Sequence, residues 1–375
     1  MLCLARVPRR AISLISRLPR TQHHLDVQYL QRQAPQRKLF LPPSYRFISS
    51  VSSRVVSMAH DEPLVPGATI QGYSGRIYTI EETLAERRSP LLCVYRASAE
   101  GKKFVVKNMI PDDYEYQKDL QGSIASCPHL RTMVDGVPGP DLFIYPFLKT
   151  NLLQFSQNKL SNATRKDILK SALTGLAALH EKNIIHSDIK PDNILLDYEL
   201  KDGAFDVTRV QIADLEDSVI LPIGKHLKNT ICGNQLWRSP ESWAKAAQGT
   251  PSDIFSFGIV SIYVMLNDMV LRASNEELAA SDSWRWVLRR QISFFAKEEE
   301  FKGLLQWIGE ENPFFERLIA LAGSFDHSEN PRKPFEYWEF VDPSFRDLIG
   351  KMTALDPVQR ITAQDALIHP WFIAD

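Results

Sequence analysis

The spacing of apolar residues changes once along the chain, near residue 149, and this change constrains the fold more than any other feature. Before it, short runs with strand character are separated by turn signals such as RRSP and AEGK: 76–82, 91–98, 103–109, 130–136 and 141–148. One helix is expected among them, around 112–126. After it, apolar residues recur at helical spacing, as in 165–183. The sequence therefore predicts an α+β fold, with a small β-rich lobe over 73–148 and a large α-helical lobe over 149–372.

Composition and charge argue against several kinds of protein. The 375 residues are 44% hydrophobic and 24% charged, as in an ordinary globular chain, and the net charge of −1 gives no indication of a nucleic-acid partner. The four cysteines are far apart and lack the CxxC spacing of zinc sites. The most apolar run, 255–270, contains Asn267 and Asp268 and is shorter than the about 18–20 residues that span a bilayer. It predicts a buried core helix and no membrane span.

The first 57 residues differ in composition from the rest of the chain. They hold ten Arg or Lys but a single acid, Asp26. This composition is typical of a mitochondrial transit peptide, so a mitochondrial location is expected. The alternatives are a disordered basic tail, or translation from Met58, with a cytoplasmic or nuclear location. Residues 58–72 contain two prolines and two glycines and are expected to form a linker.

One polar cluster lies between two apolar runs of the helical half. In IIHSDIKPDNILLD (184–197), Asp188, Lys190 and Asn193 bring an acid, a base and an amide together. The octapeptide HSDIKPDN resembles the catalytic loop of protein kinases, HRDxKxxN. Further motifs resemble that family in the expected order: FVVK (104–107), IADLED (212–217), GNQLWRSPE (233–241), SDIFSFGIV (252–260) and LDPVQRITAQDALIHPWF (355–372). The resemblance covers about 73–372 and implies the bilobal protein kinase-like fold.

The resemblance implies a role for each polar residue in transferring the γ-phosphate of ATP. That reaction needs positioning and charge stabilisation more than covalent help. Asp188 would orient the substrate hydroxyl and accept its proton, and Lys190 would neutralise charge on the transferred phosphate. Asn193 and Asp214 would give oxygen ligands to Mg²⁺, which such hard oxygen ligands suit. Lys107 would hold the α- and β-phosphates. A lysine at position 190 resembles Ser/Thr kinases more than tyrosine kinases.

The nucleotide base would bind near the segment that joins the lobes. In DLFIYPFLKTNL, Tyr145 aligns with the gatekeeper position, and Phe147 and Leu148 would offer backbone groups to adenine. The resemblance also places Leu84 and Val94, which flank the first strand turn, in the nucleotide site. In the closing segment of the family pattern, Arg360 is expected to pair with Glu241.

Two departures from the family pattern concern phosphate binding. The turn LAERRSPLLCV (84–94) has no glycine, although glycine lets backbone amides approach phosphates closely. The helix acid that should pair with Lys107 is also not assigned. The register puts Gln117 near its place, where it would hold Lys107 by an uncharged hydrogen bond, with Glu115 and Asp119 two residues away on either side. A two-residue shift turns a helical side chain by about 200°, so which of the three faces Lys107 stays open.

Two further departures lie in the motifs themselves. Glu216 replaces the glycine of the DFG motif, in which Leu215 replaces phenylalanine; the expectation is that Glu216 points to solvent, although a carboxylate near the metal is the alternative. Ser187 replaces the arginine that grips a phosphorylated activation segment, so that form of switching is not expected, although Thr230 lies in the segment.

These features allow two functions. The retained polar set favours an active Ser/Thr protein kinase that uses Mg·ATP and a protein substrate. The missing glycines, the unassigned helix acid and Glu216 favour a pseudokinase that serves as a nucleotide-binding or scaffold module. The aromatic-rich stretch 288–318 is a candidate surface for a protein partner, with ordinary core packing as the alternative.

Overall fold

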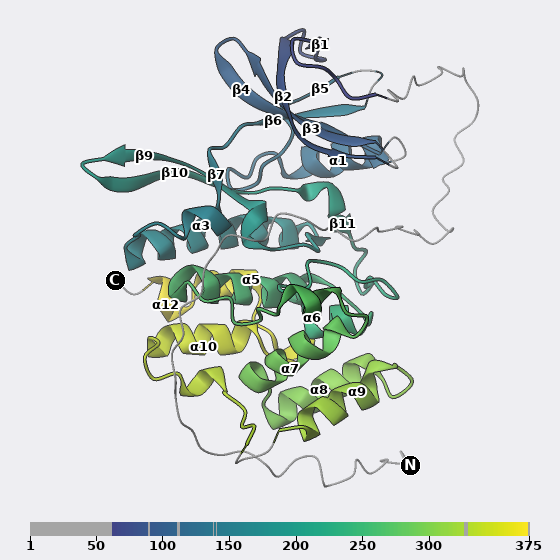
Figure 1. Cartoon of the computed structure of the whole chain (residues 1–375), viewed down its shortest axis with the longest axis vertical. Helices are drawn as coiled ribbons and strands as arrows, with labels where there is room; N and C mark the ends of the chain where they lie inside the picture. The colour runs from purple at the N-terminus through teal and green to yellow at the C-terminus, as the bar shows by residue number, and fades with distance from the viewer. Residues whose placement is uncertain are drawn as a thin grey trace.

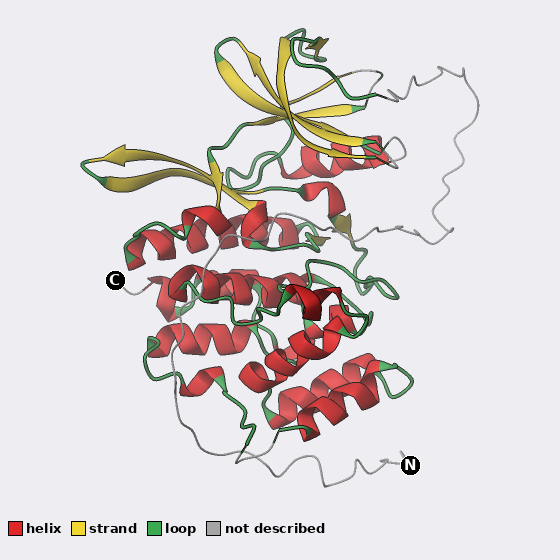
Figure 2. Cartoon of the chain, viewed as in Figure 1, coloured by secondary structure: helices red, strands yellow, loops and turns green. Residues whose placement is uncertain are grey.

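The computed structural model describes residues 62–373, apart from 89–90, 111–112, 138, 140 and 326–328. The chain forms a small β-rich lobe and a larger helical lobe, as Figures 1 and 2 show. The expected bilobal α+β architecture is therefore confirmed. The predictions for residues 1–57 lie outside the described residues.

The N-lobe is built on one six-stranded sheet with the strand order β1-β2-β3-β4-β6-β5. All neighbouring strands in it are antiparallel. Its strands are β1 (Thr69–Gln71), β2 (Ile77–Arg87), β3 (Leu92–Ala99), β4 (Lys102–Asn108), β5 (Asp135–Val137) and β6 (Leu142–Pro146). Strands β2, β3 and β4 correspond to the strands predicted at 76–82, 91–98 and 103–109. Helix α1 (Tyr114–Ile124) also lies where the sequence predicts a helix.

The two faces of this sheet bury different residues because strand side chains alternate. One face buries Tyr78, Tyr95, Phe104 and their neighbours in a core of its own. The opposite face packs against α1 through a cluster of buried residues: Val105, Met109, Tyr114, Phe143 and Tyr145. Lys107 lies between Val105 and Met109 on β4, so it belongs to this second face. The sheet thus carries the lysine on the side where α1 lies.

Two N-lobe expectations are wrong in detail. The predicted linker 58–72 contains a strand, since β1 pairs with β2 from Thr69 opposite Thr79 to Gln71 opposite Ile77. Three residues between glycines are too few for a strand pattern to be read, and pairing with β2 decides their conformation. The strand predicted at 130–136 is instead β5 (Asp135–Val137), because the chain before it turns to bond with the C-lobe strand residue Ile212.

The C-lobe is mostly helical, and one large apolar core holds it together. Its helices are α2 (Leu152–Phe155), α3 (Asn162–Glu181), α4 (Pro240–Trp243), α5 (Thr250–Leu266), α6 (Asn275–Ala279), α7 (Ser283–Phe295), α8 (Glu298–Ile308), α9 (Phe314–Gly323), α10 (Pro343–Met352), α11 (Ala363–Leu367) and α12 (Pro370–Ile373). Helix α5 is the predicted core helix. It is buried along nearly its whole length and ends at Leu266, directly before Asn267, whose φ of +54° is left-handed. In the described part of the chain, no helix is both long and apolar enough to cross a bilayer.

Helices α7, α8 and α9 contain the aromatic-rich stretch proposed above as a partner surface. Leu288, Ile292, Phe295, Leu304 and Leu318 are buried in the C-lobe core. Further aromatic side chains of the stretch are partly buried against the same core. Core packing therefore accounts for most of the apolar side chains in this stretch, and a partner there stays a prediction.

The remaining strands lie beside the polar loop. They are β7 (Thr150–Asn151), β8 (Ile184–Ile185), β9 (Ile194–Lys201), β10 (Ala204–Ile212) and β11 (Val219–Ile220). Strands β9 and β10 form a long hairpin, which projects from the body of the C-lobe in Figure 1. Asn193 and Asp214 lie just outside its two ends.

Candidate active site

The catalytic-loop motif lies between β8 and the 3₁₀ turn η3 (Pro191–Asn193), and α5 fixes its conformation. The two oxygens of Asp253 accept hydrogen bonds from the backbone N–H groups of His186, at 2.8 Å, and Ser187, at 2.9 Å. Ser187 has a φ of +68°, which is uncommon for a residue other than glycine. A buried carboxylate on a core helix thus stabilises a strained turn, and this turn directs the next residue, Asp188, toward the lobe junction.

Three groups converge on Asp188. Lys190 Nζ lies 2.6 Å from Oδ2, and the N–H of Asn234 donates to Oδ1 at 2.8 Å. The amide of Asn193 donates to the backbone carbonyl of Asp188 at 2.9 Å. Burial lowers the pKa of Lys190, but the charge of Asp188 outweighs this effect and the net pKa is raised. The structure therefore brings the predicted acid, base and amide together, with Lys190 charged.

The opposite side of the site is the ammonium group of Lys107 on β4. Its Nζ lies 2.8 Å from Oδ1 of Asp214 and 3.0 Å from Oε1 of Glu216. Burial lowers the pKa of Lys107, but the two carboxylates outweigh this effect and raise it above its usual range. The same pairing holds the pKa of Asp214 far below its usual range. A lysine of the N-lobe sheet thus binds two acids from one short segment of the C-lobe.

The expectation that Glu216 points to solvent is wrong. Its side chain is only 21% exposed, and besides Lys107 it accepts a hydrogen bond from the hydroxyl of Tyr145 at 3.0 Å. The backbone explains this position. Asp214 has a left-handed φ of +64°, and Leu215 then enters the C-lobe core at the start of the 3₁₀ turn η4 (Leu215–Asp217). The turn carries Glu216 back toward the N-lobe.

Helix α1 presents an amide, not an acid, to this cluster. Glu115 and Asp119 are exposed, whereas Gln117 is buried at 2% exposure. Its amide donates to the backbone carbonyl of Glu216 at 2.9 Å. The register that puts Gln117 on the inner face is confirmed, but the predicted hydrogen bond from Gln117 to Lys107 is replaced by this contact with the segment after Asp214.

Arg131 is a buried cation that the sequence reasoning missed. Its side chain donates twice to the backbone carbonyl of Pro146, at 2.9 and 2.7 Å, and its guanidinium carbon lies 5.1 Å from the centre of the Tyr145 ring. Burial lowers the pKa of Arg131, and the charge of Glu216 opposes that shift. The one signal in the sequence is a basic residue inside the apolar run LRTMV, which was read as an ordinary strand position.

The residues expected around the nucleotide base are placed unequally. Val94 lies directly opposite Lys107 in the β3–β4 register, and both Val94 and Phe147 pack against the cluster that contains Tyr145. Leu148 is buried, while the N–H of Phe147 donates to the carbonyl of Lys103 at 3.3 Å. Leu84 lies on β2 and is 46% exposed. The binding roles of these residues stay predictions.

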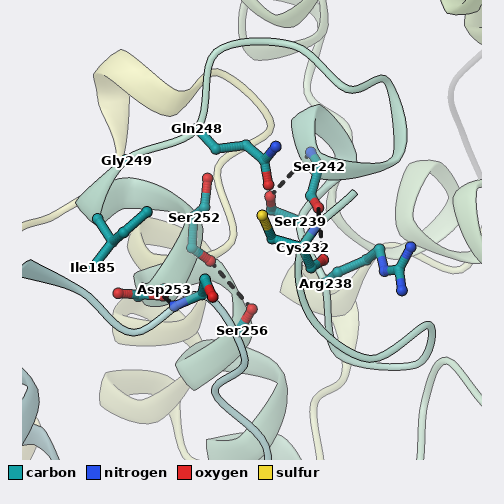
Figure 3. A pocket seen from close by; sticks show the side chains of 11 residues that line it. Ile185, Cys232, Arg238, Ser239, Ser242, Gln248, Gly249, Ser252, Asp253 and Ser256 are labelled. Atoms are coloured by element: carbon teal, nitrogen blue, oxygen red, sulfur yellow. Dashed lines mark hydrogen bonds between the residues drawn. The ribbon is translucent and has the colours of Figure 1, made fainter. Parts of the chain in front are cut away.

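The segment that follows Asp214 is anchored through Glu241, as the family pattern predicts. Arg360 forms a two-point ion pair with Glu241, with Nη–Oε distances of 2.6 and 2.8 Å, and both side chains are fully buried. Beside this pair lies a small pocket that Figure 3 shows, lined by Ser242, Gln248 and other polar residues. The hydroxyl of Ser242 donates to the carbonyl of Cys232 at 2.7 Å. The pocket thus belongs to the anchoring of the segment rather than to the reacting groups.

The comparisons with known proteins agree with the fold. A family model described as the protein kinase domain matches residues 142–372, and the chain therefore belongs to this family. The chain is 26% identical over 305 residues to the phosphorylase b kinase gamma catalytic chain, liver/testis isoform, of Bos taurus, an alignment that covers 75% of this chain and 62% of that relative. It is also 26% identical over 217 residues to the DNA damage response protein kinase DUN1 of Saccharomyces cerevisiae, covering 55% of this chain and 34% of the relative.

A plant relative gives a similar result. The calcium and calcium/calmodulin-dependent serine/threonine-protein kinase of Lilium longiflorum is 24% identical over 220 residues, which cover 59% of this chain and 33% of that protein. The chain therefore spans less than two thirds of the length of these curated relatives. What they share with it is the protein kinase domain.

Proposed function

We propose that the protein is a Ser/Thr protein kinase that transfers the γ-phosphate of Mg·ATP to a protein hydroxyl. The observation that carries this proposal is the geometry of Asp188, whose carboxylate is held from both sides by Lys190 and by the N–H of Asn234. A preorganised acid and base at a lobe junction are what phosphoryl transfer needs.

The roles of the two loop residues follow from their contacts. Asp188 can accept a hydrogen bond from a substrate hydroxyl, orient its oxygen for attack, and receive its proton as the bond to phosphorus forms. Lys190 lies at hydrogen-bond distance from the same carboxylate, so its charge can stabilise the negative charge on the transferred phosphate. Serine and threonine are the substrates that fit best, because the Lilium longiflorum relative is named as a serine/threonine-protein kinase.

The residues present fit a magnesium ion. Among the described residues, no cluster of three or more His, Cys, Asp or Glu has the arrangement of a metal site. Mg²⁺, however, is commonly bound by one or two protein oxygens together with substrate phosphates. Asn193 donates its amide nitrogen to Asp188, which leaves its amide oxygen as the remaining ligand atom, and Asp214 stays ionised beside Lys107. When bound there, Mg²⁺ would neutralise the charge of the phosphates.

A second function is favoured by one observation. The β2–β3 turn, 84–94, has no glycine, so the close backbone approach to phosphate that glycine allows is not provided by the sequence. A chain of this kind could bind nucleotide through Lys107 and act as a scaffold without transfer. Both functions include nucleotide binding, but only the kinase function depends on Asp188.

The test is γ-phosphate transfer from labelled Mg·ATP by the full chain to itself and to generic Ser/Thr protein substrates. Asp188→Asn is expected to lower the transfer rate about 10²–10⁴-fold, because it removes the proton acceptor. Glu199→Gln, which alters an exposed acid of the β9–β10 hairpin, is the matched control and should transfer like the wild type. Equal rates for the wild type and Asp188→Asn would contradict the kinase proposal, and nucleotide binding without transfer would support the scaffold.

A further inference from the structure

We propose that Glu216 is the carboxylate that positions Lys107 for the nucleotide phosphates, in place of an acid on helix α1. The proposal rests on the function proposed above, since it concerns how the same site holds its substrate. In the family pattern, an acid of the helix holds this lysine. Here the task falls to residue 216, at a position where the family pattern has glycine.

The contacts of Lys107 support this assignment. Of its two carboxylate partners, Asp214 is the predicted magnesium ligand, and a carboxylate oxygen bound to a cation is a weaker acceptor for an ammonium group. Glu216 has no such second task and lies 3.0 Å from Nζ. With Mg·ATP present, Glu216 is therefore the acid that remains to orient Lys107.

Helix α1 offers no described acid that could do this instead. Glu115 and Asp119 are exposed, and Glu115 pairs with Lys118 at 3.1 Å on the outer face. The inward residue Gln117 is neutral, and its amide already donates to the backbone carbonyl of Glu216. The helix thus supports the segment that carries the acid, while the negative charge comes from Glu216.

The surroundings of Glu216 hold its carboxylate inward. The hydroxyl of Tyr145 donates to Oε1 at 3.0 Å, and the amide of Gln121 on α1 in turn donates to that hydroxyl at 3.1 Å. The guanidinium carbon of the buried Arg131 lies 5.1 Å from the centre of the Tyr145 ring, and the charge of Arg131 interacts with that of Glu216. Burying a carboxylate is costly without charge and hydrogen-bond partners, and here the chain provides them from β4, β6 and the α1–β5 connection.

The arrangement predicts a reciprocal exchange. Gln117 and Glu216 lie in contact, with glutamine where the family has acid and acid where the family has glycine. Moving the charge from one to the other should restore the same ammonium–carboxylate pair by a different route. If Glu216 only stabilised the fold, an acid introduced at position 117 would not compensate for its loss.

The experiment measures the Kd of Mg·ATP by calorimetry, and KM for ATP and kcat by phosphate transfer, on the full chain. Glu216→Gln and Glu216→Gly are expected to weaken Mg·ATP binding about 10–100-fold, as the loss of a hydrogen bond to a charged group would. The double variant Gln117→Glu/Glu216→Gly should recover most of that loss. Glu115→Gln removes an exposed acid of the same helix and is expected to bind like the wild type.

The outcomes separate the two proposals. Wild-type Kd and kinetic constants in both single variants, or a loss that the double variant does not reverse, would overturn the positioning role of Glu216. A further outcome is that neither the wild type nor any variant transfers phosphate, while the Kd values still show the expected loss in the single variants and recovery in the double variant. In that case the positioning role of Glu216 stands and the kinase function fails. Thermal unfolding of each variant shows whether a loss of binding comes from loss of the fold.

Discussion

The two sides of the site relate to the family pattern in different ways. On the C-lobe side, Asp188, Lys190 and Asn193 lie on one loop, and Asp253 of the buried helix α5 holds this loop in place. Their positions agree with the motif. On the N-lobe side, Lys107 lies on a sheet and meets acids from another lobe, and one of these acids, Glu216, is not where the motif has one.

The difference shows that a site built from one loop can vary less in sequence than a site assembled from separate elements. A loop of a few residues anchored on one helix can keep its geometry only if the spacing of its side chains is kept. A pair assembled from separate elements requires only that some carboxylate reaches the ammonium group. The match to the protein kinase domain, residues 142–372, likewise starts at β6 and leaves β1 to β5 and α1 outside.

The largest expected effect concerns the anchor of the C-lobe side. Replacing Arg360 in the variant Arg360→Met leaves Glu241 buried and unpaired, which is expected to lower the free energy of unfolding by about 3–5 kcal/mol at pH 7. Urea unfolding followed by fluorescence measures this change. Arg285→Met, at an exposed position of α7, is the control and should stay near the wild type. A small effect for Arg360→Met would show that the C-lobe side does not depend on this pair.

The same pair predicts a pH dependence. Burial raises the pKa of Glu241, but Arg360 outweighs it, and the net pKa lies below its ordinary value of 4.5. A lowered pKa adds stability that is complete above the unfolded-state value and is lost as the pH falls. In Arg360→Met the effect of burial is no longer opposed by Arg360, so protonation of Glu241 relieves the variant as the pH falls. The difference in unfolding free energy between the wild type and Arg360→Met should therefore shrink continuously as the pH is lowered from 7 to about 4. A difference that grows on acidification would be inconsistent with this ion pair.

Lys190 tests whether the C-lobe side acts in the transfer step itself. Lys190→Met should lower kcat about 10²–10³-fold and leave the Kd of Mg·ATP near the wild-type value, because its charge lies beside Asp188 rather than Lys107. Transfer rates at saturating ATP, together with calorimetry, separate the two quantities. Lys201→Met, on the exposed end of β9, is the matched control. A change in Kd alone would place Lys190 among the nucleotide-binding residues.

Tyr145 gives a smaller test of the N-lobe side. Tyr145→Phe removes the hydroxyl that donates to Glu216 and keeps the ring, so Mg·ATP binding should weaken about fivefold, equivalent to roughly 1 kcal/mol. The value of kcat at saturating ATP should change little. The exposed Tyr337 provides the control variant Tyr337→Phe. If kcat falls and Kd does not, the division of tasks between the two sides is wrong.

The hairpin insertion is expected to matter least. Leu200 is 65% exposed near the tip of β9–β10, so Leu200→Ser should change the unfolding free energy by less than about 0.5 kcal/mol and leave transfer unchanged. Phe205→Ala on the same hairpin should cost more, because its ring packs against Phe155 at 5.2 Å. Leu200 and Phe205 lie opposite each other in the β9–β10 register, so equal effects of the two variants would mean that Leu200 also contributes to packing on the C-lobe.

The sequence was sufficient for the fold and for the C-lobe side of the site. The motif residues are local in sequence, so spacing alone brings Asp188, Lys190 and Asn193 together. The pairing of Glu241 with Arg360 spans 119 positions, and it was predictable only because both motifs resemble the family.

The N-lobe side was not predictable in the same way. The direction of Glu216 depends on the left-handed φ of Asp214 and on the burial of Leu215, and neither can be read from DLE as letters. Arg131 was missed because a strand pattern does not show where the charged group of a long side chain lies. The partner of Gln117 depends on how two lobes pack, which a helix register alone does not give.

The most direct test of the account is a crystal structure of the full chain with Mg²⁺ and a non-hydrolysable ATP analogue. The predicted result has Glu216 within hydrogen-bond distance of Lys107, the ammonium group on the phosphates, and Mg²⁺ on the oxygens of Asp214 and Asn193. Glu216 turned to solvent, with an acid of helix α1 on Lys107, would contradict the account.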